Sequence, residues 1–216
     1  MLGILKDWSS LTKLSLWYHP LPEPALAQLS GLSRLSLLCL SNCELSPSAV
    51  LHFSASKNLD QLIFDAPKAS DADTWASIAK AFPRLTIFHA SLTGPRTRED
   101  LRVLGQFRNL RTLQLERDPS DDAVRVVLDL PDLEHFRLKF GDGAIHLTPA
   151  TYIDIASHKK LTELVFANAV QFNDESLMAM AGMKQLKTLI LSNATQLTPA
   201  GIEAFKKKRP DVTFTR

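Results

Sequence analysis

The sequence LSLLCLSNCEL, from Leu35 to Leu45, contains the pattern that decides the fold. In it Leu35, Leu38 and Leu40 follow the order apolar, two variable residues, apolar, one variable residue, apolar. The same phrase begins at eight positions, which are Leu11, Leu35, Leu59, Leu85, Leu110, Leu133, Leu161 and Leu186. Neighbouring phrases start 23 to 28 residues apart. This period is typical of a solenoid built from stacked repeats.

Each phrase predicts a short β-strand, because its last two apolar residues are two positions apart and point to the same side. Apolar residues also recur three, six and nine positions before a phrase, as in Leu26, Leu29 and Leu32. This spacing predicts a helix whose apolar stripe packs on the strands. One strand and one helix cannot bury their apolar faces alone, so neighbouring repeats must stack.

Helix starts are predicted by capping residues. The pairs Ser46-Pro47, Thr148-Pro149 and Thr198-Pro199 place a hydroxyl before a proline at the first helical position. Ser120 and Asn173 are predicted to cap two further helices, each followed by two acidic residues that suit the helix dipole.

The phrase resembles the consensus of the leucine-rich repeat family, Leu-x-x-Leu-x-Leu-x-x-(Asn or Cys)-x-Leu, and Leu35 to Leu45 matches it fully with Cys43 at the ninth position. The stretch from Leu191 to Ile202 is similar to the cysteine-containing subclass, and the repeat length resembles the ribonuclease-inhibitor-like subclass. The resemblance implies an α/β fold: a curved right-handed solenoid with a parallel sheet on the concave face and helices on the convex face. The ninth position holds neither Asn nor Cys in the other repeats, so irregular loops are expected after their strands.

We expect residues 1–216 to form a single domain, because no linker is visible. Eight repeats start at Leu11, with a partial repeat over residues 1–10 and another over residues 209–216. Leu2, Leu5 and Trp8 fit the helix of the first partial unit. The edge they form either caps the solenoid or docks another domain or subunit.

Composition narrows the functional classes. The net charge of +2 lacks the basic excess of a dedicated nucleic-acid binder, so no nucleic acid is expected as a partner. No apolar run is long enough to span a membrane, and the N-terminus does not match a signal peptide. Cys39 and Cys43 are four residues apart, and an extended chain holds such residues farther from each other than a disulfide can reach. An internal disulfide is therefore not expected, which favours a reducing, cytoplasmic location. Cys43 is expected in the core and Cys39 on the surface.

The third, fifth and seventh residues of each phrase are predicted to project from the concave face, where equal positions form rows across the strands. Two clusters of candidate partner-binding residues result. One is apolar and consists of Trp17, Tyr18, Leu37, Ile63 and Ile87. The other is mixed and net-positive, with His89, Arg111, Arg117, His135, Arg137 and Lys139 and with Glu116 and Glu134 among them, and Gln114 of the fifth-position row is a further candidate. Exposed apolar patches mark contact sites, and a positive patch attracts an acidic partner. The alternatives are that Trp17 seals the end of the core and that the charged cluster is a solvated face with local ion pairs.

No catalytic, metal-binding or cofactor-binding motif is found. The six histidines lack the spacing of a helical zinc site, and no nucleophile or phosphate-binding loop accompanies them. The run Lys206 to Arg209 resembles a nuclear-localisation signal, although cations at a helix C-terminus also suit its dipole. We therefore predict a non-enzymatic scaffold without cofactors that binds a protein through its concave face, as a monomer or as a subunit of a hetero-complex. The alternative is a recognition or adaptor module of a larger assembly, of the ubiquitin-ligase receptor or immune-sensor type.

Overall fold

The computed structural model describes residues 8–18, 21–43, 45–66, 72–92, 102–116, 120–139 and 147–216. The chain divides into two compact units. Unit 1 consists of residues 1–94 and 103–110, and unit 2 consists of residues 95–102 and 111–216. Residues 1–7 of the predicted N-terminal partial repeat, which include Leu2 and Leu5, lie outside the described ranges, and so does Arg117 of the predicted mixed cluster.

In unit 1 four parallel strands follow one another in chain order: β1 (Lys13–Trp17), β2 (Leu37–Ser41), β3 (Gln61–Ala66) and β4 (Ile87–Leu92). Equal positions of successive phrases pair, so that Lys13, Leu37, Gln61 and Ile87 form one row. The helical segments are α1 (Glu23–Ala27), the 3-10 helix η2 (Pro47–Phe53), α2 (Ala72–Ala81) and the 3-10 helix η3 (Val103–Gln106).

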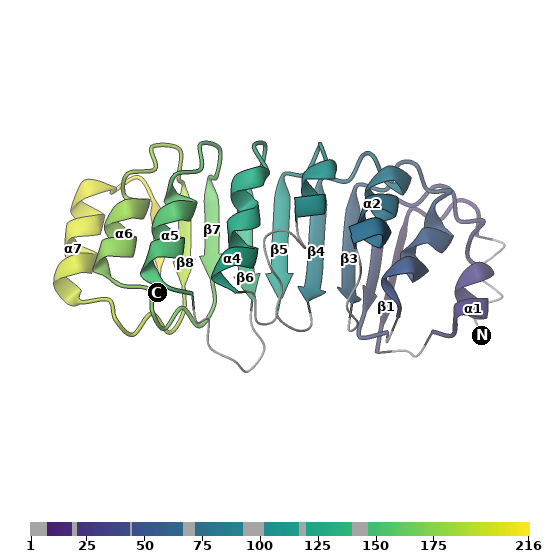
Figure 1. The fold of residues 1–216 in the computed structure, drawn as a ribbon, viewed down its shortest axis with the longest axis horizontal. Coiled ribbons are helices and arrows are strands. Elements are labelled where there is room, and N and C mark those ends of the chain that lie inside the picture. The colour runs from purple at the N-terminus through teal and green to yellow at the C-terminus, as the bar shows by residue number, and fades with distance from the viewer. Residues whose placement is uncertain are drawn as a thin grey trace. The chain divides into compact units, whose positions relative to one another are not determined.

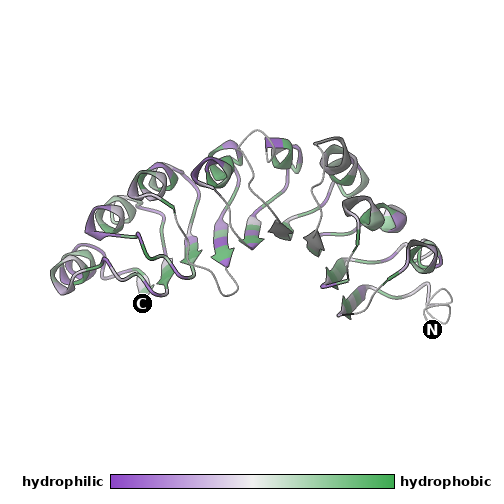
Figure 2. Ribbon diagram, turned by 60° about the horizontal axis from the view of Figure 1, so that its bottom comes forward, coloured by the Kyte–Doolittle hydropathy of each residue, from purple (hydrophilic) through white to green (hydrophobic). Residues whose placement is uncertain are grey.

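In unit 2 the parallel strands are β5 (Thr112–Glu116), β6 (His135–Lys139), β7 (Glu163–Phe166), β8 (Thr188–Leu191) and β9 (Thr213–Thr215). Its helices are α4 (Asp121–Val124), the 3-10 helix η4 (Arg125–Asp129), α5 (Pro149–Ala156), α6 (Asp174–Met180) and α7 (Pro199–Lys208). In each unit the helical segments cover one face of the strands (Figures 1 and 2). The other face is called the open sheet face below. The predicted α/β leucine-rich-repeat solenoid fold is confirmed.

The core is formed by the apolar positions of the phrase. From β2 to β8 every first, fourth and sixth residue is buried, and only Leu11 and Leu16 of the first repeat are half-buried. Aromatic rings fill the space between strands and helices: Phe88 lies 5.5 Å from Trp75 and 5.6 Å from Phe107 between ring centroids. The hydropathy colouring shows apolar residues on the inner side of the helices (Figure 2). Stacking of repeats therefore buries what a single repeat would leave exposed.

The helical segments are of two types, which the sequence pattern did not distinguish. The segments η2, η3 and η4 are 3-10 helices. A 3-10 helix has three residues per turn, so an apolar spacing of three keeps its stripe straight, whereas an α-helix needs alternating spacings of three and four. The spacing alone does not decide the type, however, since it also occurs in the α-helices α2, at Ala76 and Ala79, and α6, at Leu177 and Met180.

Three of the five predicted caps are confirmed. The side chains of Ser120, Asn173 and Thr198 accept hydrogen bonds from the backbone amides of Ala123, Ser176 and Gly201. Ser46 and Thr148 occupy the N-cap position, but their side chains accept no capping hydrogen bond, so that part of the prediction is wrong.

The acidic residues of the first helical turn bind the next repeat. Asp121 accepts hydrogen bonds from Thr148 N (2.9 Å) and Thr151 Oγ1 (2.5 Å) at the start of α5. Asp174 of α6 accepts hydrogen bonds from Thr198 N (3.0 Å) and Thr198 Oγ1 (2.6 Å) at the start of α7. A Cβ at Gly201 would collide with the Asp174 carboxylate, so this close approach requires glycine. These carboxylates therefore join each helix to the next one, in addition to interacting favourably with the dipole of their own helix.

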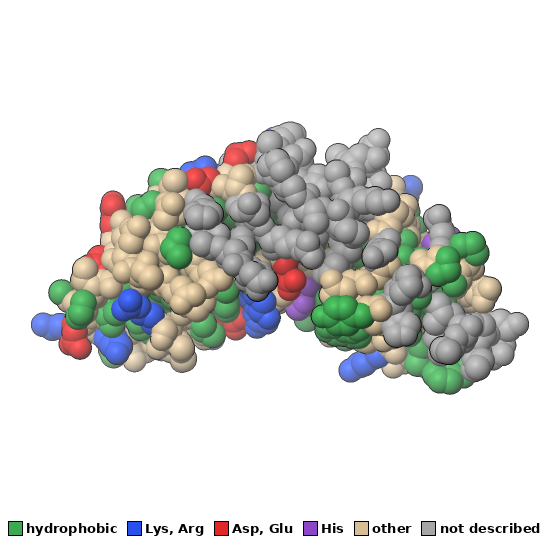
Figure 3. Space-filling view, turned by 90° about the horizontal axis from the view of Figure 1, so that it is seen from below, with side chains coloured by type: hydrophobic (Ala, Val, Ile, Leu, Met, Phe, Trp, Pro, Cys, Tyr) green, Lys and Arg blue, Asp and Glu red, His purple; other side chains and the backbone are tan. Residues whose placement is uncertain are grey.

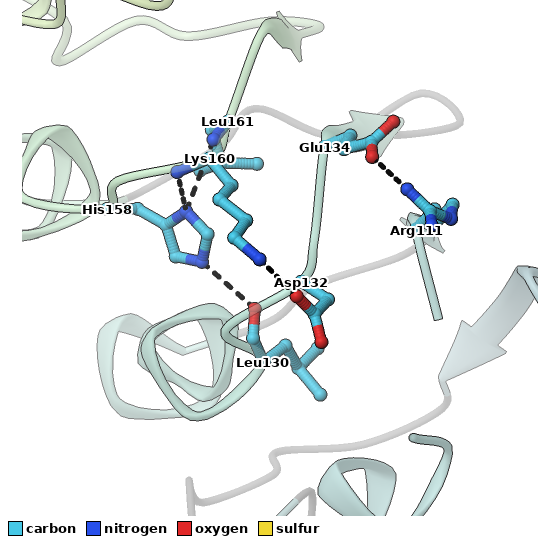
Figure 4. A network of polar contacts seen from close by, with 7 residues as sticks. All are labelled: Arg111, Leu130, Asp132, Glu134, His158, Lys160 and Leu161. Carbon is cyan, nitrogen blue, oxygen red and sulfur yellow. Dashed lines mark hydrogen bonds and ion pairs between the residues drawn. The ribbon is translucent and has the colours of Figure 1, made fainter. Parts of the chain in front are cut away.

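Where the helices end, side chains of one repeat donate hydrogen bonds to backbone carbonyl groups in the corresponding turn of the preceding repeat. His158 Nε2 donates to Leu130 O (2.9 Å), and Gln185 Nε2 donates to His158 O (2.7 Å). Nδ1 of His158 accepts hydrogen bonds from the amides of Lys160 and Leu161, at 3.2 Å each (Figure 4). His158 is therefore neutral, with its proton on Nε2.

Acidification is expected to destabilise unit 2 through His158. Burial lowers the pKa of this imidazole, and neighbouring Lys160 adds to the effect. A depressed pKa in the folded state gives stability that is complete above the unfolded value of about 6.5 and is lost as the pH falls through the folded pKa.

We expect urea denaturation to show an unfolding free energy about 1 kcal/mol lower at about pH 5 than at about pH 7, with the His158→Gln variant lacking this component. His52→Gln, in unit 1, is the matched control and should keep the wild-type pH profile. Equal pH profiles for wild type and His158→Gln would contradict this role.

Candidate partner-binding surfaces

The open sheet face of unit 1 carries the predicted apolar cluster. Trp17 and Tyr18 are 53% and 74% exposed, so Trp17 does not seal the core. Leu37, Ile63 and Ile87 are half-buried on β2, β3 and β4. Leu37 and Ile87 share one row with Gln61 between them, and Ile63 lies in the next row beside His89. The structure thus places these side chains on one face of one unit.

Two small side chains on this face are inaccessible. Cys39 and Ser41 of β2 are 1% and 5% exposed, although their positions face away from the helices. The prediction that Cys39 lies on the surface is therefore wrong. Neighbouring strands are only about 4.8 Å apart, so short side chains between longer ones lose their contact with water. In addition, Cys39 Sγ lies 3.6 Å from Ser41 Oγ.

Tyr18 has a backbone conformation that is rare for its residue type. Its φ is 56°, in the left-handed region. Asn42, Asn168 and Asn193 occupy the same eighth position of their phrases with φ between 52° and 57°. Asparagine tolerates this region, whereas a bulky side chain pays a steric cost. The recurrent asparagine at the eighth position was a signal in the sequence that our search of the ninth position missed.

The mixed cluster is divided between the units and is largely paired. In unit 2 Arg137 Nε donates to Glu163 Oε1 at 2.6 Å across β6 and β7. His135 Nδ1 lies 3.1 Å from Thr112 Oγ1. Lys139 is exposed and forms no ion pair with any residue within the described ranges. His89 is half-buried on β4 of unit 1.

Gln114 does not lie on an accessible surface. It is 4% exposed, and its Nε2 donates to Glu116 Oε1 at 2.7 Å. Its Oε1 is buried and has no hydrogen-bond partner among the residues that the structure describes. The sequence predicted an accessible side chain because strand alternation specifies the face but not how deeply neighbouring side chains cover it.

Arg111 lies apart from the open sheet face. It precedes β5 and forms an ion pair with Glu134, which precedes β6 (Figure 4). Lys139 is at the opposite end of β6. The expectation that Arg111 joins the central cluster is therefore wrong, because the second position of a phrase lies where the strand begins and not on the sheet face.

The basic run at the end of α7 is also divided. Arg209 is 9% exposed and donates from its guanidinium to the carbonyl oxygens of Met183 and Leu186. It also binds both carboxylate oxygens of Asp211, at 2.9 Å and 2.8 Å. Arg209 is thus a structural residue, and only Lys206, Lys207 and Lys208 of the run are exposed.

Two exposed acidic side chains of unit 2 lie at the edge where helices begin. Asp122 and Glu175 are exposed in the first turns of α4 and α6. Figure 3 looks at the edge where the strands end and the helices begin, and acidic side chains are visible over the helices of unit 2.

Searches for two other kinds of site were negative within the described ranges. No group of three or more His, Cys, Asp or Glu side chains there is arranged to hold a metal ion. None of the described helices is long and apolar enough to cross a membrane.

No family model and no curated protein matches the chain. Solved structures do match. A leucine-rich-repeat protein of Leptospira interrogans is 18% identical with a TM-score of 0.54 over 98% of this chain, and this chain covers 50% of that protein. Internalin C2 of Listeria monocytogenes is 19% identical with a TM-score of 0.54, covering 90% of this chain and 74% of the internalin. TLR13, solved in complex with ssRNA13, is 15% identical with a TM-score of 0.54, covering 97% of this chain and 33% of TLR13. At these identities the similarity shows the leucine-rich-repeat fold.

Replacing Tyr18 with asparagine is expected to stabilise unit 1. Asparagine accepts the left-handed backbone at the eighth position, so the unfolding free energy in urea should rise by about 1 kcal/mol. Tyr18→Ala is the control, since it also removes the ring but keeps a residue unsuited to this φ. Equal stability of the two variants would show that the backbone at Tyr18 is not strained.

Proposed function

We propose that the chain is a non-enzymatic protein-binding scaffold that recognises a protein partner through its open sheet face. The observation that carries the proposal is the exposed pair Trp17 and Tyr18 at the end of β1, in the unit whose open sheet face also carries the half-buried Leu37, Ile63 and Ile87. Tryptophan and tyrosine provide much of the binding energy at protein interfaces when neighbouring apolar groups exclude water around them.

The surrounding structure supports a preorganised contact. The strands β1 to β4 are joined in regular parallel register, so little ordering is needed when a partner binds. Tyr18 keeps an unfavourable φ while its ring is exposed to solvent. Strain of this kind is concentrated at functional positions.

Residues outside the apolar cluster supply specificity in this proposal. His89, on the row of Ile63, adds a polar group beside the apolar side chains. In unit 2 His135, Arg137 and Lys139 are the accessible polar residues of the predicted cluster. Because Glu163 pairs with Arg137, Lys139 is the residue of this group that we assign to an acidic contact.

The proposed location is a reducing, cytoplasmic compartment, since Cys39 and Cys43 are both free and buried.

The adaptor alternative is a module of a larger assembly that docks through the edge of the first repeat, where Trp8 is 49% exposed. Size-exclusion chromatography with light scattering separates the two. A self-sufficient binder is monomeric, whereas a module with an open docking edge self-associates.

Affinity capture from a native lysate, quantified by mass spectrometry, tests the binding surface. We expect the Trp17→Ala/Tyr18→Asn variant to recover the specific partner about tenfold less than wild type, because the central aromatic anchors are lost. Tyr18→Asn is expected to preserve the fold, so reduced capture would not reflect unfolding.

Trp8→Ala is the matched control. It removes another exposed tryptophan of unit 1, at the opposite end of the first repeat, and should leave capture unchanged. Unchanged capture by the Trp17→Ala/Tyr18→Asn variant, or an equal loss with Trp8→Ala, would contradict the proposed surface.

A further inference from the structure

The lysines of unit 2 gather where its helices end and its strands begin. The following residues belong to consecutive turns of this edge and are all exposed: Lys159, Lys184, Lys187, Lys206, Lys207 and Lys208. We call this set the lysine edge. None of its members forms an ion pair with another residue in the part of the chain that the structure describes.

Acidic residues on the same edge are already paired with other cations. Asp132 binds Lys160, and Asp211 binds Arg209. Glu134 binds Arg111 (Figure 4). The lysine edge is therefore a patch of uncompensated positive charge.

The turns that carry the lysines are fixed to one another by hydrogen bonds. Gln185, between Lys184 and Lys187, donates to His158 O in the turn that carries Lys159. Arg209, directly after Lys208, donates to Leu186 O at 2.7 Å and to Met183 O. These hydrogen bonds fix the backbones of three consecutive turns, and so the backbone positions of the lysines that they carry, relative to one another.

Helix dipoles explain only part of this clustering. Lys206, Lys207 and Lys208 lie in the last turn of α7, where cations are favoured. Lys184 and Lys187 lie beyond the last residue of α6, and Lys187 occupies the second position of its phrase. The stability of a helix does not require lysines there.

We propose that the lysine edge binds an acidic segment of the protein partner. The proposal rests on the proposed function, to which it adds a second contact and the chemistry of the partner. An extended acidic segment presents side chains on one side about every 7 Å, a spacing that flexible lysines on successive turns can follow.

The residue types favour carboxylates over nucleic acid. The edge has lysines, which act as point charges, and of the two arginines described there Arg209 is buried and paired with Asp211 and Arg111 is paired with Glu134. Phosphate groups are instead bound preferentially by the fork of arginine. Binding of single strands also uses exposed aromatic rings, and among the described residues of unit 2 the exposed large apolar side chain is Ile190.

The probe is a fluorescein-labelled peptide of alternating Asp and Glu, long enough to span three repeats, followed by fluorescence anisotropy at low ionic strength. The Lys184→Glu/Lys187→Glu variant should weaken binding about tenfold or more, and added salt should weaken wild-type binding. Lys57→Glu/Lys80→Glu is the matched control: it exchanges two exposed lysines of unit 1, changes the net charge equally and should change affinity less than about twofold. Circular dichroism verifies the fold of each variant.

The outcomes separate this inference from the proposed function. The Trp17→Ala/Tyr18→Asn variant should bind the acidic peptide as wild type does, even though it loses the partner. Absence of peptide binding, or equal weakening by the Lys184→Glu/Lys187→Glu and Lys57→Glu/Lys80→Glu variants, would overturn the proposal that the lysine edge binds an acidic segment. Tighter binding of a single-stranded oligonucleotide or of phosphatidylserine vesicles, lost in the Lys184→Glu/Lys187→Glu variant, would overturn the acidic protein segment as its ligand.

Discussion

The turn that follows a helix in unit 2 receives a side-chain hydrogen bond from the next repeat. His158, Gln185 and Arg209 donate to the backbone oxygens of Leu130, His158 and Leu186, each in the turn of the preceding repeat. These bonds add to the backbone hydrogen bonds within the turns, such as Leu133 N to Leu130 O, so each repeat stabilises the one before it. Asp121 and Asp174 do the same at the opposite edge by binding the start of the next helix.

This dependence has consequences for the surfaces. Arg209 is buried, and Arg111 and Arg137 are each paired with a carboxylate of the next repeat, so their charges are already compensated. What is left is an apolar, aromatic surface on unit 1 and a lysine edge on unit 2. Both are carried by backbone that is already ordered, which reduces the entropic cost of binding.

The repeat phrase predicted the strands, their parallel order and the buried positions, because apolar spacing reflects burial directly. It predicted helical segments without specifying their type, since a spacing of three occurs both in the 3-10 helix η4 and in the α-helix α6. The rows predicted that Leu37 and Ile87 occupy equal positions on the sheet, and the structure pairs both of them with Gln61. The burial of Gln114 and the pairing of Arg137 with Glu163 depend on side-chain lengths across neighbouring strands, which one phrase does not contain.

The central claim is that the partner lies on the open sheet face of unit 1. Hydrogen-deuterium exchange of the chain with and without its captured partner tests this most directly. The account predicts slower exchange in the complex for residues 13–18 and 37–42, which carry Trp17, Tyr18 and Leu37, with further protection at residues 184–187. Protection confined to the helices α5 and α6, with unchanged exchange in β1 and β2, would contradict it.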